Sequence, residues 1–427
     1  MSRVRSVLLV AVITILTASG VTRAQPLQDP GALAQPPMSP FISIEPNALE
    51  NTSPAVAYGG RQYLVVWEEH VHGGEVAIYG RFVGSGGEPL GSSFPIRHDT
   101  NQQFYRPDVA YSPRHDTFLV VFYWQYSADD YDIWAMPVSG DGVVGTRIIV
   151  DGDLGDRDWY PSVAYNSQAD EFLVVYEKYI SNTRRDIEAQ RVRAADGTLA
   201  SWRNIAGAAD DLRRLPDVAY NAARNEYLIA YTLHPSPTGG GDIVARISDA
   251  TMATLGSELQ ITPIHSSPAQ DGVAVDAGPD EYFLAWREDY GGGVYRVWGR
   301  RVTGAGSLQP FINMNVSSTN NRLEPAVGFG DGGHYLIPMR YVSGGTSAWD
   351  IHGHLVGASQ NVLEEPEFQI DTTSGNQRSP AVSCAASGPC LVVYEDNWPG
   401  AAGDDYNVMG RLVGTYRIFA PVVLRDA

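Results

Sequence analysis

The chain has 427 residues, with 49 acidic and 30 basic side chains and a formal net charge of −19 at pH 7. This excess of negative charge argues against a nucleic-acid groove and against a basic membrane-surface patch. Hydrophobic residues make up 44% of the chain and aromatic residues 10%, so the chain can bury a large core and is not disordered.

The N-terminal segment has the pattern of a secretory signal over residues 1–24. Arg3 and Arg5 precede an apolar stretch at 7–16, and small residues near Ala24 provide a cleavage site. The apolar stretch is too short to span a membrane, and no other stretch is long enough. We therefore expect a protein without a transmembrane segment that is secreted or held in the periplasm or at the cell surface. Residues 25–40 are rich in proline, which predicts an extended tether.

Internal repetition is the strongest pattern in the sequence. A Pro-x-Val-Ala-Tyr motif, in weaker form in the last three copies, begins at Pro54, Pro107, Pro161, Pro216, Asp271, Pro325 and Pro380. The valine of the motif recurs every 53 to 55 residues, at Val56, Val109, Val163, Val218, Val273, Val327 and Val382. Each motif is followed by three more apolar runs, and the last of them carries Ile96, Ile149, Ile205, Ile261, Ile312 or Ile370.

These runs predict an all-β fold. They are short, rich in Val, Ile, Tyr and Phe, and separated by Gly, Asn and Asp, which is typical of strands and not of helices. Four strands in each of seven units predict a seven-bladed β-propeller of four-stranded antiparallel blades, a single domain over residues 41–415. The apolar tail at 416–427 breaks the repeat, and it either packs on the closing blade or acts as a sorting element.

The spacing also predicts how the ring closes. Ile44 stands 12 residues before Val56, as Ile370 stands 12 residues before Val382. Residues 41–46 should therefore form the outer strand of the last blade, beside residues 407–413, which leaves no open edge at the seam.

Cys384 and Cys390 are the two cysteines of the chain, and they occupy repeat positions that are mostly aromatic elsewhere. The corresponding pairs are Tyr58 and Tyr63, Tyr111 and Phe118, Tyr165 and Phe172, Tyr220 and Tyr227, Val275 and Tyr282, Phe329 and Tyr335. Because these positions flank one turn and should face each other, we predict a disulfide in place of the aromatic contact. A redox or metal-binding pair is the alternative.

The loops at one face of the predicted ring concentrate the negative charge. The loops between second and third strands and those between blades together hold 30 acidic and 13 basic residues, a net charge of −17. The same loops hold the aromatic residues Phe104, Tyr105, Trp124, Tyr126, Trp159, Tyr160, Tyr179, Tyr290, Tyr341, Trp349 and Trp398. Aromatic rings beside carboxylates suit stacked sugars or bound cations, and the alternative is that the rings fill gaps between blades.

One aligned position differs from unit to unit, directly after the aromatic or apolar residue that ends the second strand. It holds Glu68, Tyr123, Glu177, Thr232, Arg287, Arg340 and Glu395. Glutamates and arginines here could supply an acid, a base and an anion clamp, although salt-bridged rim residues would give the same pattern. Tyr105, Trp124, Trp159 and Trp398 complete the candidate ligand-binding set, and Asp108 and Asp217 are further candidates near the axis.

Clustered acidic residues also suggest a metal. Asp151, Asp153, Asp156 and Asp158 fall within eight residues, and a second cluster holds Asp396, Asn397, Asp404 and Asp405. Oxygen ligands of this kind suit calcium, whereas the alternative is a solvated acidic loop. The pairs His70 with His72 and His352 with His354 fall short of a four-ligand zinc site. No cofactor is required by any motif.

The Pro-x-Val-Ala-Tyr, Leu-Val-Val-Tyr and Asp-Ile-x-Ala motifs resemble the repeats of uncharacterised secreted bacterial β-propeller proteins. The resemblance implies a seven-bladed ring and no particular activity. The sequence favours an exported, monomeric binding module whose acidic, aromatic-rich face holds a glycan, a cationic ligand or a basic protein. The alternatives are an extracellular polysaccharide hydrolase or lyase that uses the second-strand ends, and a purely structural role at the cell surface.

Overall fold

The computed structural model describes residues 36–71, 73–153, 155, 157–207, 210–235, 240–264, 268–315, 320–330, 332–343, 348–361, 363, 367–397 and 405–414. The predicted signal, most of the predicted tether and the predicted tail lie outside the described residues. The same holds for His72, Asp156, Trp398 and Asp404.

The described residues form strands and contain no helix, so the fold is all-β as predicted, and no membrane-spanning helix is present among them. The first two groups of consecutive strands are β2 (Glu50–Tyr58), β3 (Gln62–Val71), β4 (Glu75–Gly84), β5 (Pro89–Arg97), then β6 (Gln103–Ser112), β7 (Thr117–Ser127), β8 (Asp130–Ser139), β9 (Ile148–Asp151). The third and fourth are β10 (Asp158–Asn166), β11 (Glu171–Ser181), β12 (Arg184–Arg193), β13 (Leu199–Ala206), then β14 (Leu212–Asn221), β15 (Glu226–His234), β16 (Asp242–Asp249), β17 (Leu259–Gln260). The fifth is β18 (Ala269–Ala277), β19 (Glu281–Asp289), β20 (Tyr295–Thr303), β21 (Leu308–Asn313).

In the sixth group the first strand is divided in two. This group consists of β22 (Asn321–Leu323), β23 (Gly328–Phe329), β24 (His334–Val342), β25 (Trp349–Gly357) and β26 (Phe368–Asp371). The last group consists of β27 (Gln377–Cys384), β28 (Cys390–Asp396), β29 (Asn407–Val413) and β1 (Ile42–Glu45). Strands within each group pair antiparallel, and single parallel pairs, Val76 with Gln103 and Arg185 with Leu212, join two groups into one sheet at two places.

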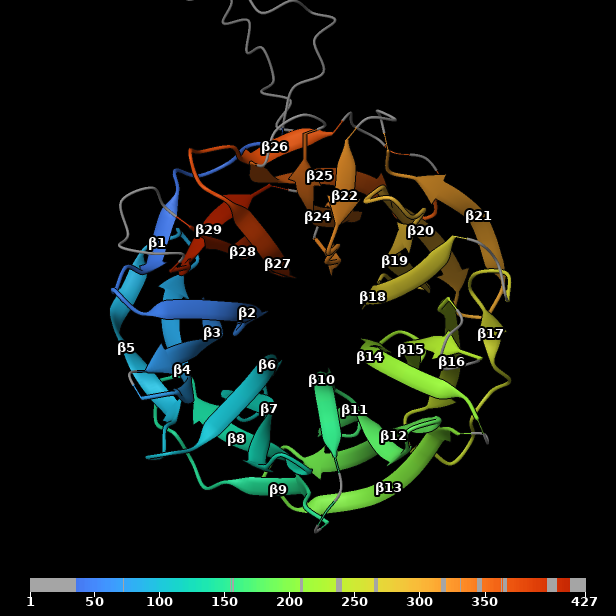
Figure 1. The fold of residues 1–427 in the computed structure, drawn as a ribbon, viewed down its shortest axis with the longest axis horizontal. Helices are drawn as coiled ribbons and strands as arrows, with labels where there is room; N and C mark the ends of the chain where they lie inside the picture. Colours follow the sequence, from blue (N-terminus) through green and yellow to red (C-terminus); the bar gives the residue numbers. More distant parts are fainter. Residues whose placement is uncertain are drawn as a thin grey trace, which may run out of the picture. The chain divides into compact units, whose positions relative to one another are not determined.

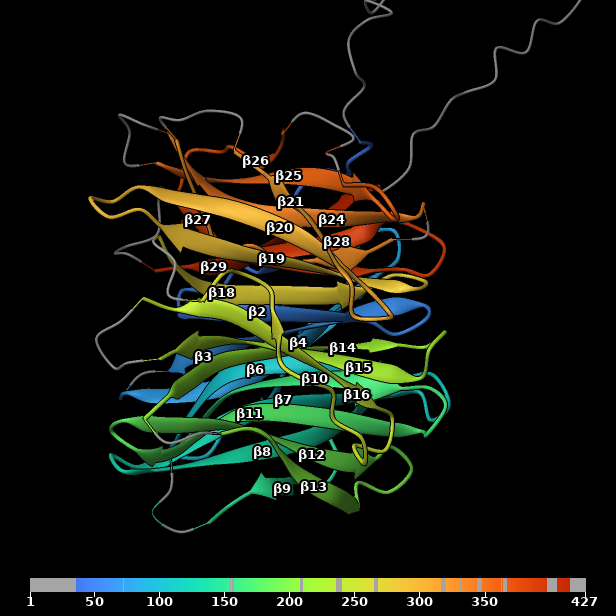
Figure 2. The same cartoon turned by 90° about the vertical axis from the view of Figure 1, so that its right-hand side faces the viewer.

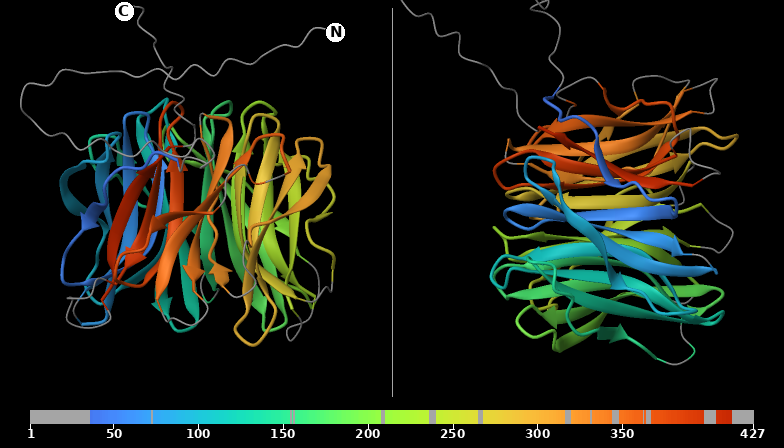
Figure 3. Two further views of the ribbon diagram at one scale, coloured as in Figure 1. Left: turned by 90° about the horizontal axis from the view of Figure 1, so that it is seen from above. Right: turned by 90° about the vertical axis from the view of Figure 1, so that its left-hand side faces the viewer.

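The groups are arranged around one axis, as in a β-propeller (Figure 1). The first strand of each group lies nearest the axis and the fourth lies at the periphery, and the side views show the strands running roughly along that axis (Figures 2 and 3). All of these strands belong to one compact unit, Gln35–Ala427.

The hydrophobic core lies between neighbouring groups. The second strand of each group is apolar on both faces, and residues 63–67 of β3 are fully buried. Each face packs on a different neighbour, which explains why these strands read as continuous apolar runs and not as alternating ones. For example, Trp67 and Val65 of β3 share one core cluster with Leu391 and Val393 of β28.

β1 pairs with β29, with Ile42 opposite Gly410, as the spacing of Ile44 and Ile370 predicts. Ile44 and Ile370 are both fully buried, and each lies at an irregularity in its own outer strand. The corresponding residue of the second group is Val150 and not the predicted Ile149, because Val150 lies at the irregularity and is 6% exposed, whereas Ile149 is 45% exposed.

The first strand of nearly every group carries a β-bulge just before the motif valine. In β2 the bulge comprises Ser53 and Pro54, between the pairs Thr52 with Glu68 and Ala55 with Val66. The first bulge residue has a positive φ in each case, between 49° and 61°, at Ser53, Arg106, Tyr160, Leu215, Gly272, Glu324 and Ser379. The bulge fixes where each backbone turns away from its partner strand.

The register of the fifth group corrects the sequence alignment. Its bulge comprises Gly272 and Val273, so Val275, and not the predicted Val273, corresponds to Val56 of the first group. The residue that faces Tyr282 across the turn is therefore Ala277, and Val275 faces Leu284 instead.

The remaining cross-strand aromatic pairs are confirmed. Ring centroids lie 4.9 Å apart for Tyr58 and Tyr63 and 4.7 Å apart for Tyr111 and Phe118. The pairs Tyr165 with Phe172, Tyr220 with Tyr227 and Phe329 with Tyr335 have centroid separations of 5.2, 5.2 and 4.9 Å. In the last group, Cys384 and Cys390 form a disulfide at the same place, with Cα atoms 3.8 Å apart.

Replacing Cys384 and Cys390 together by alanine is expected to lower the free energy of unfolding by about 2 kcal/mol, because the bridge closes only a short loop in the unfolded chain. Urea denaturation of the variant and of the wild type measures this difference. The wild type with reductant should match the variant, and a loss limited to the variant would contradict the assignment.

Candidate functional site

A cavity of about 740 Å³ lies on the axis of the strand groups, at the end where their second strands finish. We call it the axial cavity. Every strand group contributes to its lining, which comprises Glu50, Thr52, Ser53, Pro54, Glu68, His70, Arg106, Pro107, Tyr160, Pro161, Leu215, Pro216, Asp217, Val273, Glu324, Arg340, Arg378, Ser379, Pro380 and Glu395. Of the candidates at the second-strand ends, the cavity brings together Glu68, Arg340 and Glu395.

The bulges form much of the cavity lining. Six of the bulge residues with positive φ line it, namely Ser53, Arg106, Tyr160, Leu215, Glu324 and Ser379. A non-glycine residue in this conformation is strained by about 1 kcal/mol or more, so it persists only where neighbouring contacts hold it. In most groups this position directly precedes the motif proline, and the repeat pattern does not by itself predict that the position lines a cavity.

Glutamates at the second-strand ends hold the strained bulges of the following group. The Arg106 N–H donates to Oε1 of Glu68 at 2.7 Å, and the Ser53 N–H donates to Oε1 of Glu395 at 2.8 Å. The Leu215 N–H donates to Oε2 of Glu177 at 3.3 Å. These three carboxylates therefore connect neighbouring groups. This structural role accounts for the glutamates at the second-strand ends.

Glu177 does not line the axial cavity. Its carboxylate is fully buried beside Arg185, with Arg214 Nε at 3.7 Å. Burial raises its pKa, and the two guanidinium groups oppose that rise. Glu177 thus makes the same inter-group contact as Glu68 and Glu395 without access to the cavity.

Charge is balanced at three aligned positions around the cavity: the residue before each bulge, the first bulge residue and the second-strand end. They hold five arginines and five acidic residues, Arg106, Arg214, Arg287, Arg340 and Arg378 against Glu68, Glu177, Asp271, Glu324 and Glu395. Arg287 Nε donates to Asp271 at 2.8 Å, Arg340 lies 3.1 Å from Glu324, and Arg378 donates to Glu395. The excess negative charge of the chain therefore lies outside this inner set.

Two of the glutamates that line the cavity, Glu68 and Glu395, have opposite pKa shifts. Burial disfavours the ionised form of Glu68, but hydrogen bonds from His70 and the Arg106 N–H outweigh burial, and its pKa lies below the ordinary value. Burial raises the pKa of Glu395 despite the charge of Arg378. Burial thus opposes ionisation of both carboxylates, and hydrogen bonds outweigh burial only at Glu68.

His70 lies beside the carboxylate of Glu68 and also lines the cavity. Thr52 Oγ1 lies 3.0 Å from His70 Nε2 and donates to Oε2 of Glu68 at 3.2 Å. The contact with Glu68 raises the pKa of His70 above its ordinary value. His70 is therefore an accessible titratable group in contact with the ionised carboxylate.

Asp108 and Asp217 lie near the axis, and their hydrogen bonds connect four consecutive groups, the second to the fifth. Asp108 accepts the Val163 N–H at 2.8 Å, and Asp217 accepts both the Ser162 hydroxyl and the Val275 N–H at 2.8 Å. Burial and the charge of Asp217 raise the pKa of Asp108 to about 7. Of the two, only Asp217 lines the cavity.

The candidate aromatic residues pack mainly on one another. Tyr105 and Tyr123 have ring centroids 5.4 Å apart, and Trp159 lies 5.6 Å from Tyr131. Trp124 packs on Trp134 at 4.2 Å and donates from Nε1 to Gln102. None of these candidates lines the axial cavity, and the aromatic residue that does is Tyr160.

Arg287, the remaining charged candidate, also lies outside the cavity lining. It is paired with Asp271 and lies over the ring of Tyr295 at 5.2 Å. Arg340, which does line the cavity, lies over the ring of Trp349 at 4.7 Å.

The predicted calcium cluster surrounds a lysine. Lys178 Nζ lies 3.0 Å from Asp151, 3.2 Å from Asp158 and 3.9 Å from Asp153. The ammonium group supplies a positive charge to this cluster of aspartates. Within the described residues, which leave out Asp156, no group of three or more His, Cys, Asp or Glu is arranged to hold a metal ion.

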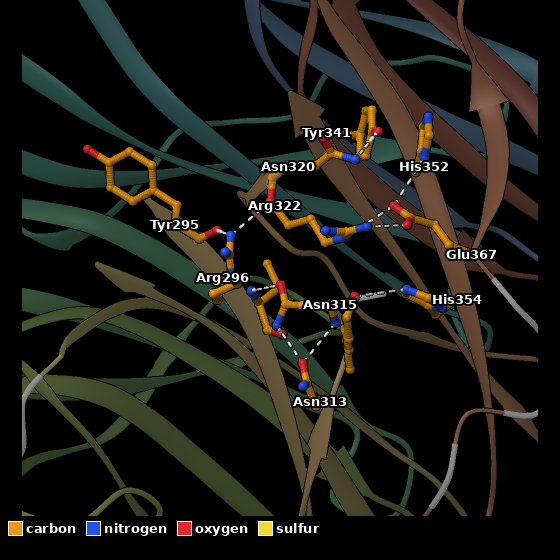
Figure 4. Close-up of polar contacts among 12 residues, drawn as sticks. Tyr295, Arg296, Asn313, Asn315, Asn320, Arg322, Tyr341, His352, His354 and Glu367 are labelled. Carbon is orange, nitrogen blue, oxygen red and sulfur yellow. Dashed lines mark hydrogen bonds and ion pairs between the residues drawn. The ribbon is translucent and has the colours of Figure 1, made fainter. Parts of the chain in front are cut away.

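The second predicted histidine pair forms part of a buried polar network in the sixth group (Figure 4). Arg322 and His352 both point at the carboxylate of Glu367, with Nε of Arg322 and Nδ1 of His352 each 3.1 Å from its Oε1. His354 Nε2 contacts the Met314 carbonyl instead, and burial lowers the pKa of His354 to about 4. The two histidines therefore bind different partners.

Comparison with known proteins places the chain by fold. No protein-family model matches it, and no curated protein matches it either. An α-L-arabinofuranosidase from Fusarium graminearum, solved with an iminosugar inhibitor, is 14% identical with a TM-score of 0.51, covering 88% of this chain and 98% of its own. An α-L-arabinanase from Penicillium chrysogenum, solved with arabinobiose, is 14% identical with a TM-score of 0.50, covering 89% and 99%.

A third similar structure has a different kind of parent protein. The β-propeller domain of the trilobed protease from Pyrococcus furiosus is 10% identical with a TM-score of 0.51, covering 88% of this chain and 98% of its own. At these identities the likeness concerns the fold, and together the three structures identify it as a β-propeller.

Proposed function

We propose that the protein is an extracytoplasmic glycoside hydrolase that binds a saccharide in the axial cavity. The observation that carries this proposal is that one cavity is lined by both Glu68 and Glu395, whose pKa values are shifted in opposite directions. A volume of about 740 Å³ suits a small ligand such as a short oligosaccharide.

Hydrolysis of a glycosidic bond uses one protonated carboxyl group and one ionised carboxylate. In this proposal Glu395 protonates the leaving oxygen, and Glu68 acts as the ionised partner, either as the nucleophile or as the base that activates water. Arg378 donates to Glu395, and the proposal requires that this hydrogen bond break when Glu395 carries its proton.

The similar structures suggest which saccharides to try first. Two of them are arabinose-releasing or arabinan-cleaving enzymes by name, and one was solved with arabinobiose. Because a shared fold does not determine activity, these names guide the choice of substrates and do not carry the proposal.

We also infer that the scaffold is a closed ring of seven blades. Contacts between the first strands support this inference, because β2 contacts β6 on one side and β27 on the other. The Tyr58 N–H donates to Ser383 at 3.0 Å and the Ser53 N–H donates to Glu395, which are bonds between the first and last groups. The disulfide between Cys384 and Cys390 supports an oxidising location outside the cytoplasm.

The expected result of replacing Glu68 or Glu395 by glutamine is a loss of turnover of at least about 100-fold. Glutamine retains an oxygen that can accept the bulge N–H, so the fold should persist. Glu177→Gln is the matched control, since it alters the same inter-group contact outside the cavity. Release of reducing sugar from a panel of arabinans and other plant polysaccharides measures turnover.

A second candidate function is saccharide binding without turnover, as an exported binding module. The inter-group hydrogen bonds favour it, because Glu68, Glu177 and Glu395 all have the same structural role. Equal, small effects of the three glutamine variants on sugar binding, with no turnover by the wild type, would support this function and contradict hydrolysis.

A further inference from the structure

The arginines around the axial cavity differ in whether a carboxylate balances them. Arg287, Arg340 and Arg378 pair with Asp271, Glu324 and Glu395, and Arg214 lies 3.7 Å from Glu177. Arg106 is the exception. Among the residues that the structure describes, no carboxylate forms an ion pair with its guanidinium group, although the charge of Arg106 contributes to the lowered pKa of Glu68, and the residue is exposed.

The backbone of Arg106 is fixed although its side chain is not paired. Its φ is 53°, its N–H donates to Glu68 at 2.7 Å, and Pro107 follows it. Its guanidinium lies over the ring of Tyr160, 5.6 Å from the centroid, and both residues line the cavity. An aromatic ring under a guanidinium orients the planar group and leaves its N–H donors free for a ligand.

The nearby carboxylate of Glu68 already accepts hydrogen bonds from groups other than the Arg106 guanidinium. Oε1 of Glu68 accepts the Arg106 N–H, and Oε2 accepts from Thr52 and lies 3.7 Å from His70. An anion that enters the cavity therefore meets Arg106 as its available cation, and a carboxylate matches the fork of a guanidinium group.

We propose that the cavity recognises an acidic saccharide, in which Arg106 pairs with the carboxylate of a uronic acid residue stacked near Tyr160. This inference rests on the proposed saccharide site and adds its substrate class. The net charge of −19 repels long polyanions, so the expected ligand is a mainly neutral oligosaccharide that carries a single uronate.

The test compares two probes that differ only in one uronic acid: xylotriose and the same trisaccharide substituted with glucuronic acid. Calorimetric titration of the wild type should give tighter binding of the acidic probe. Arg106→Gln is expected to weaken acidic-probe binding by about tenfold to 100-fold, as for loss of a hydrogen bond to a charged group, and to leave neutral-probe binding unchanged.

Arg287→Gln is the matched control, because it removes one positive charge from the same inner set without altering the cavity lining. It should affect the two probes equally and slightly. Equal binding of both probes by the wild type, or equal weakening by the Arg106 and Arg287 variants, overturns the uronate proposal and leaves the saccharide site standing. Failure of both probes to bind, together with failure of the arabinan panel, overturns both proposals.

Discussion

Replacement of Lys178 by methionine is expected to lower the free energy of unfolding by about 3–5 kcal/mol, as for other buried ion pairs that lose one partner. Lys178 is the only lysine of the chain, and its side chain is 8% exposed. Its ammonium lies 3.0 Å from Asp151 and 3.2 Å from Asp158, whose side chains are 11% and 1% exposed. Without it, two neighbouring carboxylates repel each other in a poorly hydrated site.

Urea denaturation at pH 7 measures this loss, and its pH dependence identifies the cause. The uncompensated carboxylates of the variant should take up protons more readily, so the destabilisation should shrink as the pH falls toward 5. Asp153→Asn is the matched control, because Asp153 belongs to the same loop but is 81% exposed, and its loss should change stability by less than about 0.5 kcal/mol.

The same experiment tests the calcium hypothesis. Because Lys178 already supplies a positive charge to this cluster, calcium chloride should leave the melting temperature of the wild type unchanged. A rise with calcium that the Asp153 variant lacks would support a calcium site and contradict the assignment of the cluster to the lysine.

Replacement of Arg322 by methionine is expected to cause a loss of similar size, about 3–5 kcal/mol. Arg322 is fully buried and donates to both carboxylate oxygens of Glu367, which also contacts His352. Burial would raise the pKa of Glu367, but hydrogen bonds from His352 and Arg322 outweigh burial and lower it. In the wild type this group therefore adds stability above the ordinary carboxyl range and loses it as the pH falls.

The variant should show the opposite dependence, because its buried carboxylate is unpaired at neutral pH and gains stability on protonation. The loss measured by denaturation should thus be largest near pH 7 and smaller near pH 4. Arg61→Met is the matched control, since Arg61 pairs with Asp116 at 2.8 Å with its side chain 64% exposed, and should cost less than about 1 kcal/mol. Equal losses in the two variants, or a loss independent of pH, would contradict the proposed origin.

Repetition in the sequence predicted the strands and the aromatic pairs, because both depend on spacing within one unit. It also predicted the partner of β1, because Ile44 stands as far before its motif valine as Ile370 does. The fifth unit shows where spacing fails. Val273 and Val275 are two residues apart and point to the same face, so a shift of two leaves the apolar pattern unchanged. Only the bulge at Gly272 and Val273 determines which valine corresponds to Val56.

Much of the candidate site could not be predicted, because its contacts join different units. Glu68 holds the bulge at Arg106, and no local pattern shows that these residues meet. The sequence also does not distinguish Glu177, which is enclosed by arginines, from Glu395, which reaches the cavity. The contacts of Lys178 with three aspartates likewise result from the packing of strands, and the spacing of these residues in the sequence does not predict them.

The pairing of β1 with β29 has a consequence for the time course of folding. β1 is among the first strands to be synthesised and β29 is the last described one, with Ile42 opposite Gly410. Contacts between residues this far apart in the chain form slowly. A long loop must first close, at a cost in conformational entropy, before these contacts can stabilise the fold. Until then β1 and the last group expose unpaired backbone groups, so the nascent protein passes through a stage open to proteolysis and to pairing with other chains.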